Sequence, residues 1–348
     1  MLGLDRVVAR YIWTAVCIVL LLAIVYAIRR TLFVFIIALL FAYLLWPLVN
    51  FLDRRLPGRS RVPALAIVYI LLVGLLVVLG TAIGTRVASE ATTFGTKIPE
   101  LIAKLKQSSE PIASSSVPSL KTRALSILRE QIDSHSSELM SQVPKIALGV
   151  LAHVEIILFI ILVPILGFFF LKDGRSILAD ILGLVADGPQ RAKAEEILAD
   201  IHILLAQYIR ALVLLSLATF AAYTSFLTLI GTPYAVLLGA IAAPLEFIPM
   251  VGPFTAAVIV LLVAGVSGFP HLVWILIFLI AYRLFQDYVL QPMLLGAGVE
   301  LHPLLIIFGV MAGGQIAGIA GSFLSVLILA TLRIVYRQLR FRPLPGKY

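Results

Sequence analysis

Three ionisable residues lie deep inside long apolar runs of this sequence: Glu246, Arg283 and Asp287. Two more, Glu155 and Arg210, lie near the ends of two other runs. A charge at the centre of a bilayer costs about 2.5–3.5 kcal/mol on insertion scales. Each of these side chains is therefore expected to face the interior of a helix bundle, with a partner or water, and each is a candidate for chemistry.

The run that holds Glu246, residues 234–267, is interrupted in its middle by prolines and a glycine. Proline lacks a backbone donor, and broken backbone at membrane depth is tolerated only against protein or a water-filled cavity. A discontinuous helix that carries an acid therefore indicates a transport or binding site. We interpret Glu246 as a proton-carrying or substrate-contacting group, and the alternative is a carboxylate that only bonds freed backbone donors. The pathway candidates in this interruption are Glu246, Pro249, Gly252 and Pro253.

A second polar group lies in the next apolar run. Arg283 and Asp287 are four residues apart and share a helix face. One hypothesis is that Arg283, Gln286, Asp287 and Gln291 form one wall of a pathway. The other is an ion pair within one helix that neutralises itself.

The composition is that of a membrane protein. The chain has 348 residues, of which 61% are hydrophobic and 13% charged, with a mean hydropathy of +1.08. A soluble domain of this size cannot bury so much apolar surface, so the sequence predicts an all-α polytopic protein of the lipid bilayer. The net charge of +9 does not indicate nucleic acid, because the basic residues gather at the ends of apolar runs. With the single cysteine Cys17, neither a Cys-based metal site nor an intrachain disulfide is possible, and no cofactor is predicted.

The apolar runs predict about eight transmembrane helices, because about 20 residues cross a bilayer as a helix. The interrupted run is interpreted as one broken helix that still crosses once. Lysines and arginines near the span ends place both termini in the cytoplasm, although Arg29 and Arg30 fall on the other side, in a tight hairpin between the first two spans. The runs are 11–28, 31–49, 63–86, 147–171, 208–230, 234–267, 271–295 and 303–332.

The polar segments complete the predicted organisation. Spans 1–3 occupy residues 1–87, a small extracytoplasmic helical cap 88–146, and span 4 residues 147–171. An amphipathic cytoplasmic helix follows in 172–206, then spans 5–8 in 207–335 and a basic cytoplasmic tail in 336–348.

The last span is rich in glycine at a spacing of four. Two G-x-x-x-G motifs predict close helix packing, within one chain or between chains. The packing candidates are Gly309, Gly313, Gly314 and Gly318.

Several stretches together resemble the autoinducer-2 exporter family of bacterial membrane proteins. The resemblance is strong from about residue 165 to 332, and its most specific signature is Phe247–Pro253 followed by Leu301–Leu304. Further matching stretches are Phe168–Gly174, Gln207–Arg210, Gln291–Gly296 and Gly313–Gly321.

The resemblance implies an oligomeric, eight-span protein of the bacterial inner membrane that moves solutes outward. Members are associated with export of autoinducer-2, a small polar furanone-type compound of quorum sensing, and others with exchange of sodium or lithium for protons. Many members place an uncharged residue where this chain has Glu246, so the resemblance does not imply an acid-dependent mechanism.

Four functions compete at this stage. The first is an exporter of a small polar solute, driven by a gradient because the nucleotide-binding motif G-x-x-x-x-G-K-[ST] does not occur. The second is a sodium or lithium/proton antiporter that uses Glu246 and Asp287. A weaker alternative is an intramembrane hydrolase with Ser267 as nucleophile and His271 as base, and a structural role is the fourth. The sequence favours a transporter over an enzyme.

Overall fold

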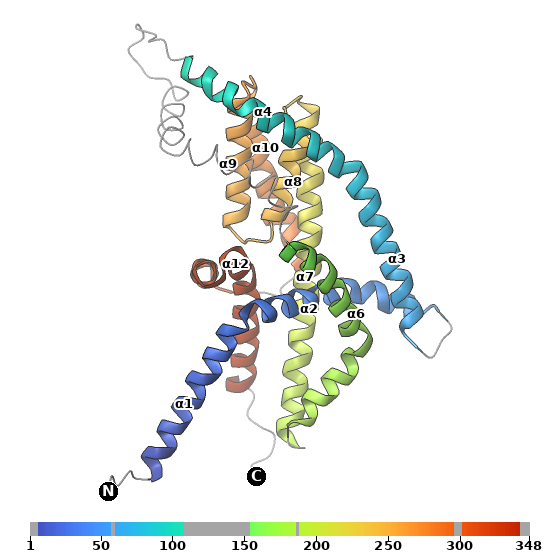
Figure 1. Ribbon diagram of the computed structural model, residues 1–348, viewed down its shortest axis with the longest axis vertical. Coiled ribbons are helices and arrows are strands. Elements are labelled where there is room, and N and C mark those ends of the chain that lie inside the picture. The colour runs from blue at the N-terminus through green and yellow to red at the C-terminus, as the bar shows by residue number, and fades with distance from the viewer. Residues whose placement is uncertain (1–5, 57–59, 108–153, 186–187, 296–300, 342–348) are drawn as a thin grey trace. The chain divides into compact units, whose positions relative to one another are not determined.

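The computed structural model describes residues 6–56, 60–107, 154–185, 188–295 and 301–341, and these residues form helices without strands (Figure 1). Six of the helices are long and apolar enough to cross a membrane, and two shorter apolar helices accompany them. The protein is therefore an all-α polytopic membrane protein, as predicted. The elements are α1 (Arg6–Ala27), α2 (Arg29–Asp53), α3 (Val62–Leu79), η1 (Gly80–Gly84), α4 (Thr85–Gln107), α6 (Val154–Gly183), α7 (Pro189–Leu229), α8 (Ala235–Leu245), α9 (Val251–Val266), α10 (Leu272–Phe285), η2 (Gln286–Leu290), α11 (Gln291–Leu295) and α12 (Pro303–Phe341).

The chain divides into two compact units. The first comprises Met1–Val68 and Val154–Ile181, and the second Tyr69–His153 and Leu182–Tyr348. The predicted cap lies outside the described residues beyond Gln107, and the predicted tail lies outside them beyond Phe341.

In the first unit, α1 leads into α2 through a single residue, Ile28. The backbone N–H of Ile28 donates to Ile24, and the carbonyl of Ile28 accepts from Leu32, so helical hydrogen bonding continues across the junction. The tight hairpin expected around Arg29 is therefore not formed, because the chain bends there without reversing. Rings of α2 and α6 pack together in the same unit, with the centroids of Phe33 and Phe159 5.8 Å apart.

In the second unit, α3 continues through the π-helical turn η1 into α4, and α4 contacts α8 and α9. The Glu90 carboxylate accepts a hydrogen bond of 2.8 Å from the backbone N–H of Leu237, in the first turn of α8. The ring of Phe94 packs edge-on against Tyr234, at 5.0 Å between centroids. Tyr234 precedes α8 in a left-handed conformation and provides no side-chain cap, so Glu90 supplies the missing acceptor from another helix.

Four helices, α7 to α10, share the apolar core of the second unit. Its fully buried members include Leu227, Leu238, Val260 and Ile275. Gly239 allows α8 to lie directly on α7, because a Cβ there would lie 2.2 Å from the hydroxyl oxygen of Thr224. This core fixes the helices that carry the polar residues described below.

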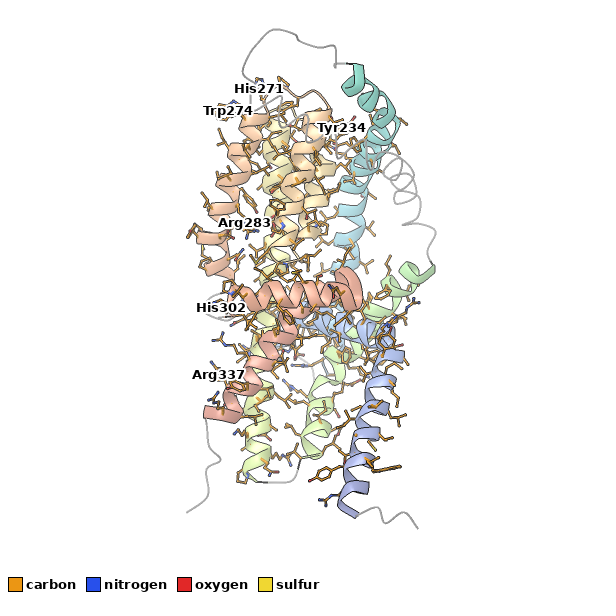
Figure 2. All side chains as sticks on the ribbon, turned by 90° about the vertical axis from the view of Figure 1, so that its left-hand side faces the viewer. Tyr234, His271, Trp274, Arg283, His302 and Arg337 are labelled. Atoms are coloured by element: carbon orange, nitrogen blue, oxygen red, sulfur yellow. The ribbon has the colours of Figure 1, made fainter. Side chains whose placement is uncertain are left out.

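The interrupted run forms a helical hairpin. Figure 2 shows Tyr234, before α8, and His271, after α9, at the same end of the second unit. The helices α8 and α9 contact each other, and only five residues join them. The sequence predicts that this run crosses the membrane once as one broken helix. That prediction is wrong, because the chain reverses its direction between α8 and α9.

The predicted amphipathic helix 172–206 is shared between two helices in the structure. Residues 172–183 belong to α6, and residues 189–206 form the first half of α7. Gly188 lies between them with φ 123°, a conformation that suits glycine. The 41 residues of α7 make a helix about 60 Å long.

The last predicted span is bent. Residues Ala317 and Gly318 leave the helical conformation, and Gly318 has φ 60°. The two arms of α12 meet beside this turn, because a Cβ on Gly313 would lie 2.3 Å from the carbonyl oxygen of Gly321. The second arm reaches the first half of α7, where the Gln338 amide donates to Asp200 at 2.8 Å.

Candidate functional site

The tip of the α8–α9 hairpin holds strained backbone. Met250 has φ 64° and ψ −52°, and the N–H of Val251 donates to the carbonyl of Pro249 at 2.8 Å. This is a γ-turn of the rare, strained form. Such strain costs about 1–3 kcal/mol and is concentrated at functional sites.

The glycine and prolines of the interruption fit the sharp turn between α8 and α9. A Cβ on Gly252 would lie 1.7 Å from the carbonyl oxygen of Leu245, so only glycine lets the start of α9 approach the end of α8 this closely. Pro253 is the third residue of α9, where a helix has no internal use for a backbone N–H. Pro249 is half-buried within the turn.

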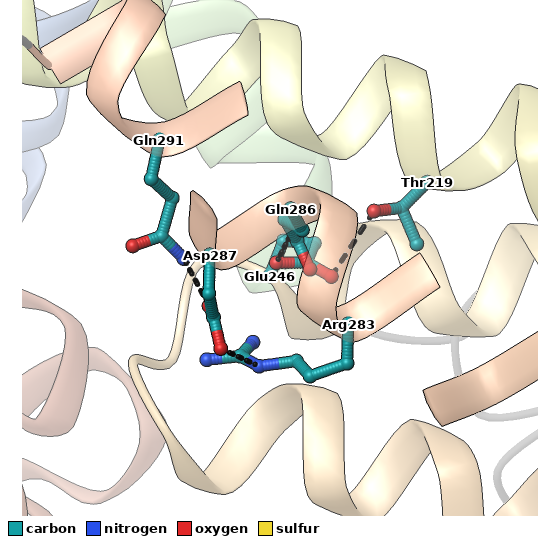
Figure 3. Close-up of polar contacts among 6 residues, drawn as sticks. All are labelled: Thr219, Glu246, Arg283, Gln286, Asp287 and Gln291. Atoms are coloured by element: carbon teal, nitrogen blue, oxygen red, sulfur yellow. Dashed lines mark hydrogen bonds and ion pairs between the residues drawn. The ribbon is translucent and has the colours of Figure 1, made fainter. Parts of the chain in front are cut away.

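Glu246 lies at this tip and is the centre of a buried polar network (Figure 3). One carboxylate oxygen, Oε1, accepts a hydrogen bond of 3.0 Å from the Thr219 hydroxyl on α7. The other, Oε2, accepts one of 2.8 Å from the amide of Gln286 on η2. The residues are 7%, 0% and 1% exposed respectively. The hairpin, α7 and the π-helical turn after α10 thus converge on one carboxyl group.

The network continues from Thr219 to a second hydroxyl. The Thr219 and Tyr282 hydroxyl oxygens are 2.9 Å apart. On the same face of α7, Ser216 donates to the carbonyl of Ala243 at 2.8 Å and ties the end of α8 to α7. The ring of Tyr223, one turn beyond Thr219, packs edge-on against Tyr282.

The second polar group is an ion pair beside the network. Arg283 Nε lies 2.9 Å from Asp287 Oδ2, and the Gln291 amide donates to Oδ1 of the same aspartate at 3.0 Å. Arg283 and Asp287 are 38% and 37% exposed. The ion pair of the second hypothesis is therefore present, and of the four residues of the strip only Gln286 donates to Glu246 in the described structure.

The remaining predicted positions lie elsewhere. Arg210 is exposed on α7 and makes no side-chain hydrogen bond or ion pair with the described residues. Gly309, Gly313 and Gly314 line the meeting of the two arms of α12, whereas Gly318 forms the turn and has open space around it. Ser267 has a buried hydroxyl without a hydrogen-bond partner in the described structure, so the Ser267–His271 pair of the hydrolase hypothesis is not formed.

Sequence reasoning missed Thr219 and Tyr282. A signal for Thr219 was present, because Ser216, Thr219 and Tyr223 follow one another at spacings of three and four within an apolar run. That spacing places them on one helix face. Tyr282 gives no such signal, since a tyrosine in an apolar run is usually part of the core.

The arrangement suits a group that takes up and releases a proton. In the described part of the chain, no Lys, Arg or His pairs with Glu246, and its partners are neutral donors. Glu246 follows the last residue of α8, and the carboxyl end of a helix carries partial negative charge. No group of three or more His, Cys, Asp or Glu residues among the described positions could hold a metal ion.

A family profile described as AI-2E family transporter matches residues 15–341. The chain belongs to the AI-2E transporter family. The matched range includes every element of the Glu246 network, from α7 to η2. As an AI-2E family protein, the chain is a multi-pass membrane transporter.

Relatives of this AI-2E family protein occur in several bacteria. YueF of Bacillus subtilis, named as a transport protein, is 24% identical over 302 residues, covering 83% of this chain and 79% of YueF. MT0215 of Mycobacterium tuberculosis, also named as a transport protein, is 29% identical over 84% of this chain and 79% of its own length. PerM of Escherichia coli K12, named as a permease, is 26% identical over 86% of this chain and 84% of PerM.

Proposed function

We propose that this protein is a secondary transporter that exports a small polar solute, of the kind of autoinducer-2, across the bacterial inner membrane. An ion gradient drives the export, and Glu246 at the hairpin tip is the coupling group. The observation that carries the proposal is the buried Glu246 carboxyl, held by three elements and paired with no cation among the described residues. Membership of the AI-2E transporter family supports the class.

The depth of Glu246 supports this role. Tyr234 and the exposed Trp274 lie at the same end of the second unit (Figure 2), and aromatic residues of this kind mark membrane–water interfaces. Glu246 lies 12 residues after Tyr234 along α8, which corresponds to about 18 Å. Since the hydrocarbon core is about 30 Å thick, Glu246 would lie near the midplane, where many transporters bind their substrates.

The proposed topology places both termini in the cytoplasm, in a homo-oligomer surrounded by lipid. Arg191 and Lys193 precede the apolar half of α7, which favours a cytoplasmic start for this helix. Asp200 of α7 accepts a hydrogen bond from Gln338 near the end of α12. The end of α12 would therefore lie on the same side as the start of α7, although α8 and α9 turn back.

The test is transport by purified protein in proteoliposomes with an imposed proton gradient. Autoinducer-2, sodium and lithium are offered in turn as the transported species. Glu246→Gln is expected to reduce gradient-driven transport at least tenfold while the protein remains folded. Glu195→Gln, the same change at an exposed position of α7, is the matched control and is expected to leave transport unchanged. Transport by Glu246→Gln at the wild-type rate at every pH would refute the role of Glu246.

A sodium or lithium/proton antiporter is the second candidate. The observation that favours it is the same buried Glu246 carboxyl, which accepts hydrogen bonds from neutral donors only among the described residues and can carry the proton of such an exchange. Fluorescence dequenching on addition of sodium or lithium to acidified inverted vesicles separates the candidates, because only the antiporter gives a response without another solute.

A further inference from the structure

The hydrogen-bond donors around Glu246 identify the ion that this residue can take. Each carboxylate oxygen faces one donor, the Thr219 hydroxyl at Oε1 and the Gln286 amide nitrogen at Oε2. Both donors belong to residues that are at most 1% exposed. An ion that binds this carboxyl group must therefore be compatible with donors that already occupy it.

A metal cation does not meet this condition. Hard cations are bound by several oxygen atoms at once, and here the hydrogens of Thr219 and Gln286 point at the two oxygens that would be ligands. A sodium or lithium ion would find only the second lone pairs of Oε1 and Oε2 and the oxygen of Thr219, because Gln286 presents its amide nitrogen, a donor, to the carboxylate. To offer its amide oxygen as a further ligand, Gln286 would have to turn its NH2 group away from Oε2, and a buried donor without a partner costs about 1–3 kcal/mol.

A proton meets the condition without movement of heavy atoms. The Thr219 hydroxyl has one hydrogen and two lone pairs. When an O–H bond forms at Oε1 with a proton from solution, this hydrogen can be donated to Thr219. The Thr219 hydrogen then turns to the Tyr282 hydroxyl oxygen, which lies 2.9 Å away and can accept it. Gln286 continues to donate to Oε2.

We propose that the ion carried by Glu246 is a proton, and that Thr219 and Gln286 are positioning residues that hold the carboxyl group in both charge states and exclude sodium and lithium. The inference rests on the proposed function only in taking Glu246 as the coupling group. In an antiporter, the metal ion would then bind away from Glu246. Among the described residues, the titratable and charged groups that couple electrostatically to this carboxyl are Tyr223 on α7 and Tyr282, Arg283 and Asp287 on α10 and η2.

Infrared difference spectroscopy of the purified full-length protein tests this inference without transport. Spectra between alkaline and acidic buffer are expected to show the C=O stretching band of a protonated carboxyl group that is missing in Glu246→Gln. At constant pH and ionic strength, replacement of choline chloride by sodium or lithium chloride is expected to leave the amplitude of this band unchanged. A band that shrinks when sodium or lithium is added would overturn the proposal, as would the absence of any band that depends on Glu246.

The positioning role has its own readout in the frequency of the same band. Gln286→Leu and Thr219→Val are expected to shift the band, because each removes a hydrogen-bond partner of the carboxyl group. Thr219→Ser keeps the hydroxyl and is expected to restore the wild-type frequency. Tyr223→Phe is the matched control, since the Tyr223 hydroxyl makes no hydrogen bond with the described residues. Equal frequencies in wild type, Thr219→Val and Gln286→Leu would refute the positioning role.

The infrared result and the transport result are independent. If sodium leaves the amplitude of the band unchanged and autoinducer-2 is not exported, the proton site would stand and the proposed solute would be refuted. If export needs Glu246 but sodium removes the band, the proposed function would stand and the assignment of a proton to Glu246 would be refuted.

Discussion

Replacement of Gly252 by alanine is expected to open the tip of the α8–α9 hairpin. The added Cβ would lie 1.7 Å from the Leu245 carbonyl oxygen and 2.7 Å from its carbonyl carbon. Carbon and oxygen atoms in close contact are about 3.3 Å apart, so the two backbones must separate by roughly 1.6 Å. The obstacle is backbone, which cannot turn aside as a side chain can. The hydrogen bond from the Gly252 N–H to Ile248, now 2.9 Å long, would be lost with this movement.

The expected cost combines two terms. Overpacking a close contact costs about 1–3 kcal/mol, and loss of one backbone hydrogen bond about 0.5–1.5 kcal/mol. A total of about 2–4 kcal/mol would lower the apparent melting temperature by about 4–16 °C, taking about 2–4 °C per kcal/mol. The measurement is intrinsic-fluorescence melting in detergent at one scan rate, since membrane proteins often unfold irreversibly.

The matched control for this change lies in the same helix. At Gly265 an added Cβ meets only the Leu272 side chain, at 3.8 Å. Gly265→Ala is expected to leave the melting temperature unchanged or to raise it slightly, because alanine in a helix is favoured over glycine by about 1 kcal/mol. If Gly252→Ala melted at the same temperature as Gly265→Ala, the close contact of α8 and α9 at the tip would be disproved.

Two further predictions concern the elements around the site. Glu90→Ala removes the acceptor for the first turn of α8 and is expected to cost about 1 kcal/mol of stability, as loss of a helix cap does. The control is Lys97→Ala, an exposed change in the same helix. Glu90→Ala is expected to melt at a lower temperature than Lys97→Ala, and equal melting temperatures would contradict this prediction. Asp287→Asn leaves Arg283 without its partner and is expected to reduce the yield of folded protein more than the double change Arg283→Gln and Asp287→Asn, measured by size-exclusion chromatography, because an unpaired charge is worse than no charge. A double variant that is as poor as Asp287→Asn would show that neutralisation is not the role of this pair.

The class of the fold followed from apolar runs, and the place of the site followed from one of their interruptions. Glu246 was identified because an acid beside three prolines is unusual in an apolar run. The direction of the chain after Glu246 was not predictable from the same residues. A kinked crossing and a hairpin both need prolines and a glycine, and the difference lies in the approach of Gly252 to Leu245, which is a tertiary contact.

The bend in α12 shows the same limit. The spacing of Gly309, Gly313 and Gly314 predicts a close helix contact, but spacing does not name the partner helix. In the structure the partner is the other arm of α12, because Gly318 adopts φ 60° and turns the chain. Four glycines at one spacing therefore serve two purposes, three in packing and one in a turn, and the sequence pattern does not separate them.

Because Glu246 lies at the hairpin tip, its charge state affects how strongly the tip is held against α7 and η2. Its two hydrogen-bond donors come from α7 and η2, neither of which is part of the hairpin. Movement of the tip away from these helices would break both bonds together. An ionised carboxylate without these donors would be a buried charge without partners, which costs several kcal/mol, whereas a protonated carboxyl pays only the smaller cost of a neutral polar group. The hairpin is therefore expected to leave α7 and η2 more readily when Glu246 carries a proton, and this difference is what couples an ion gradient to movement in a transporter.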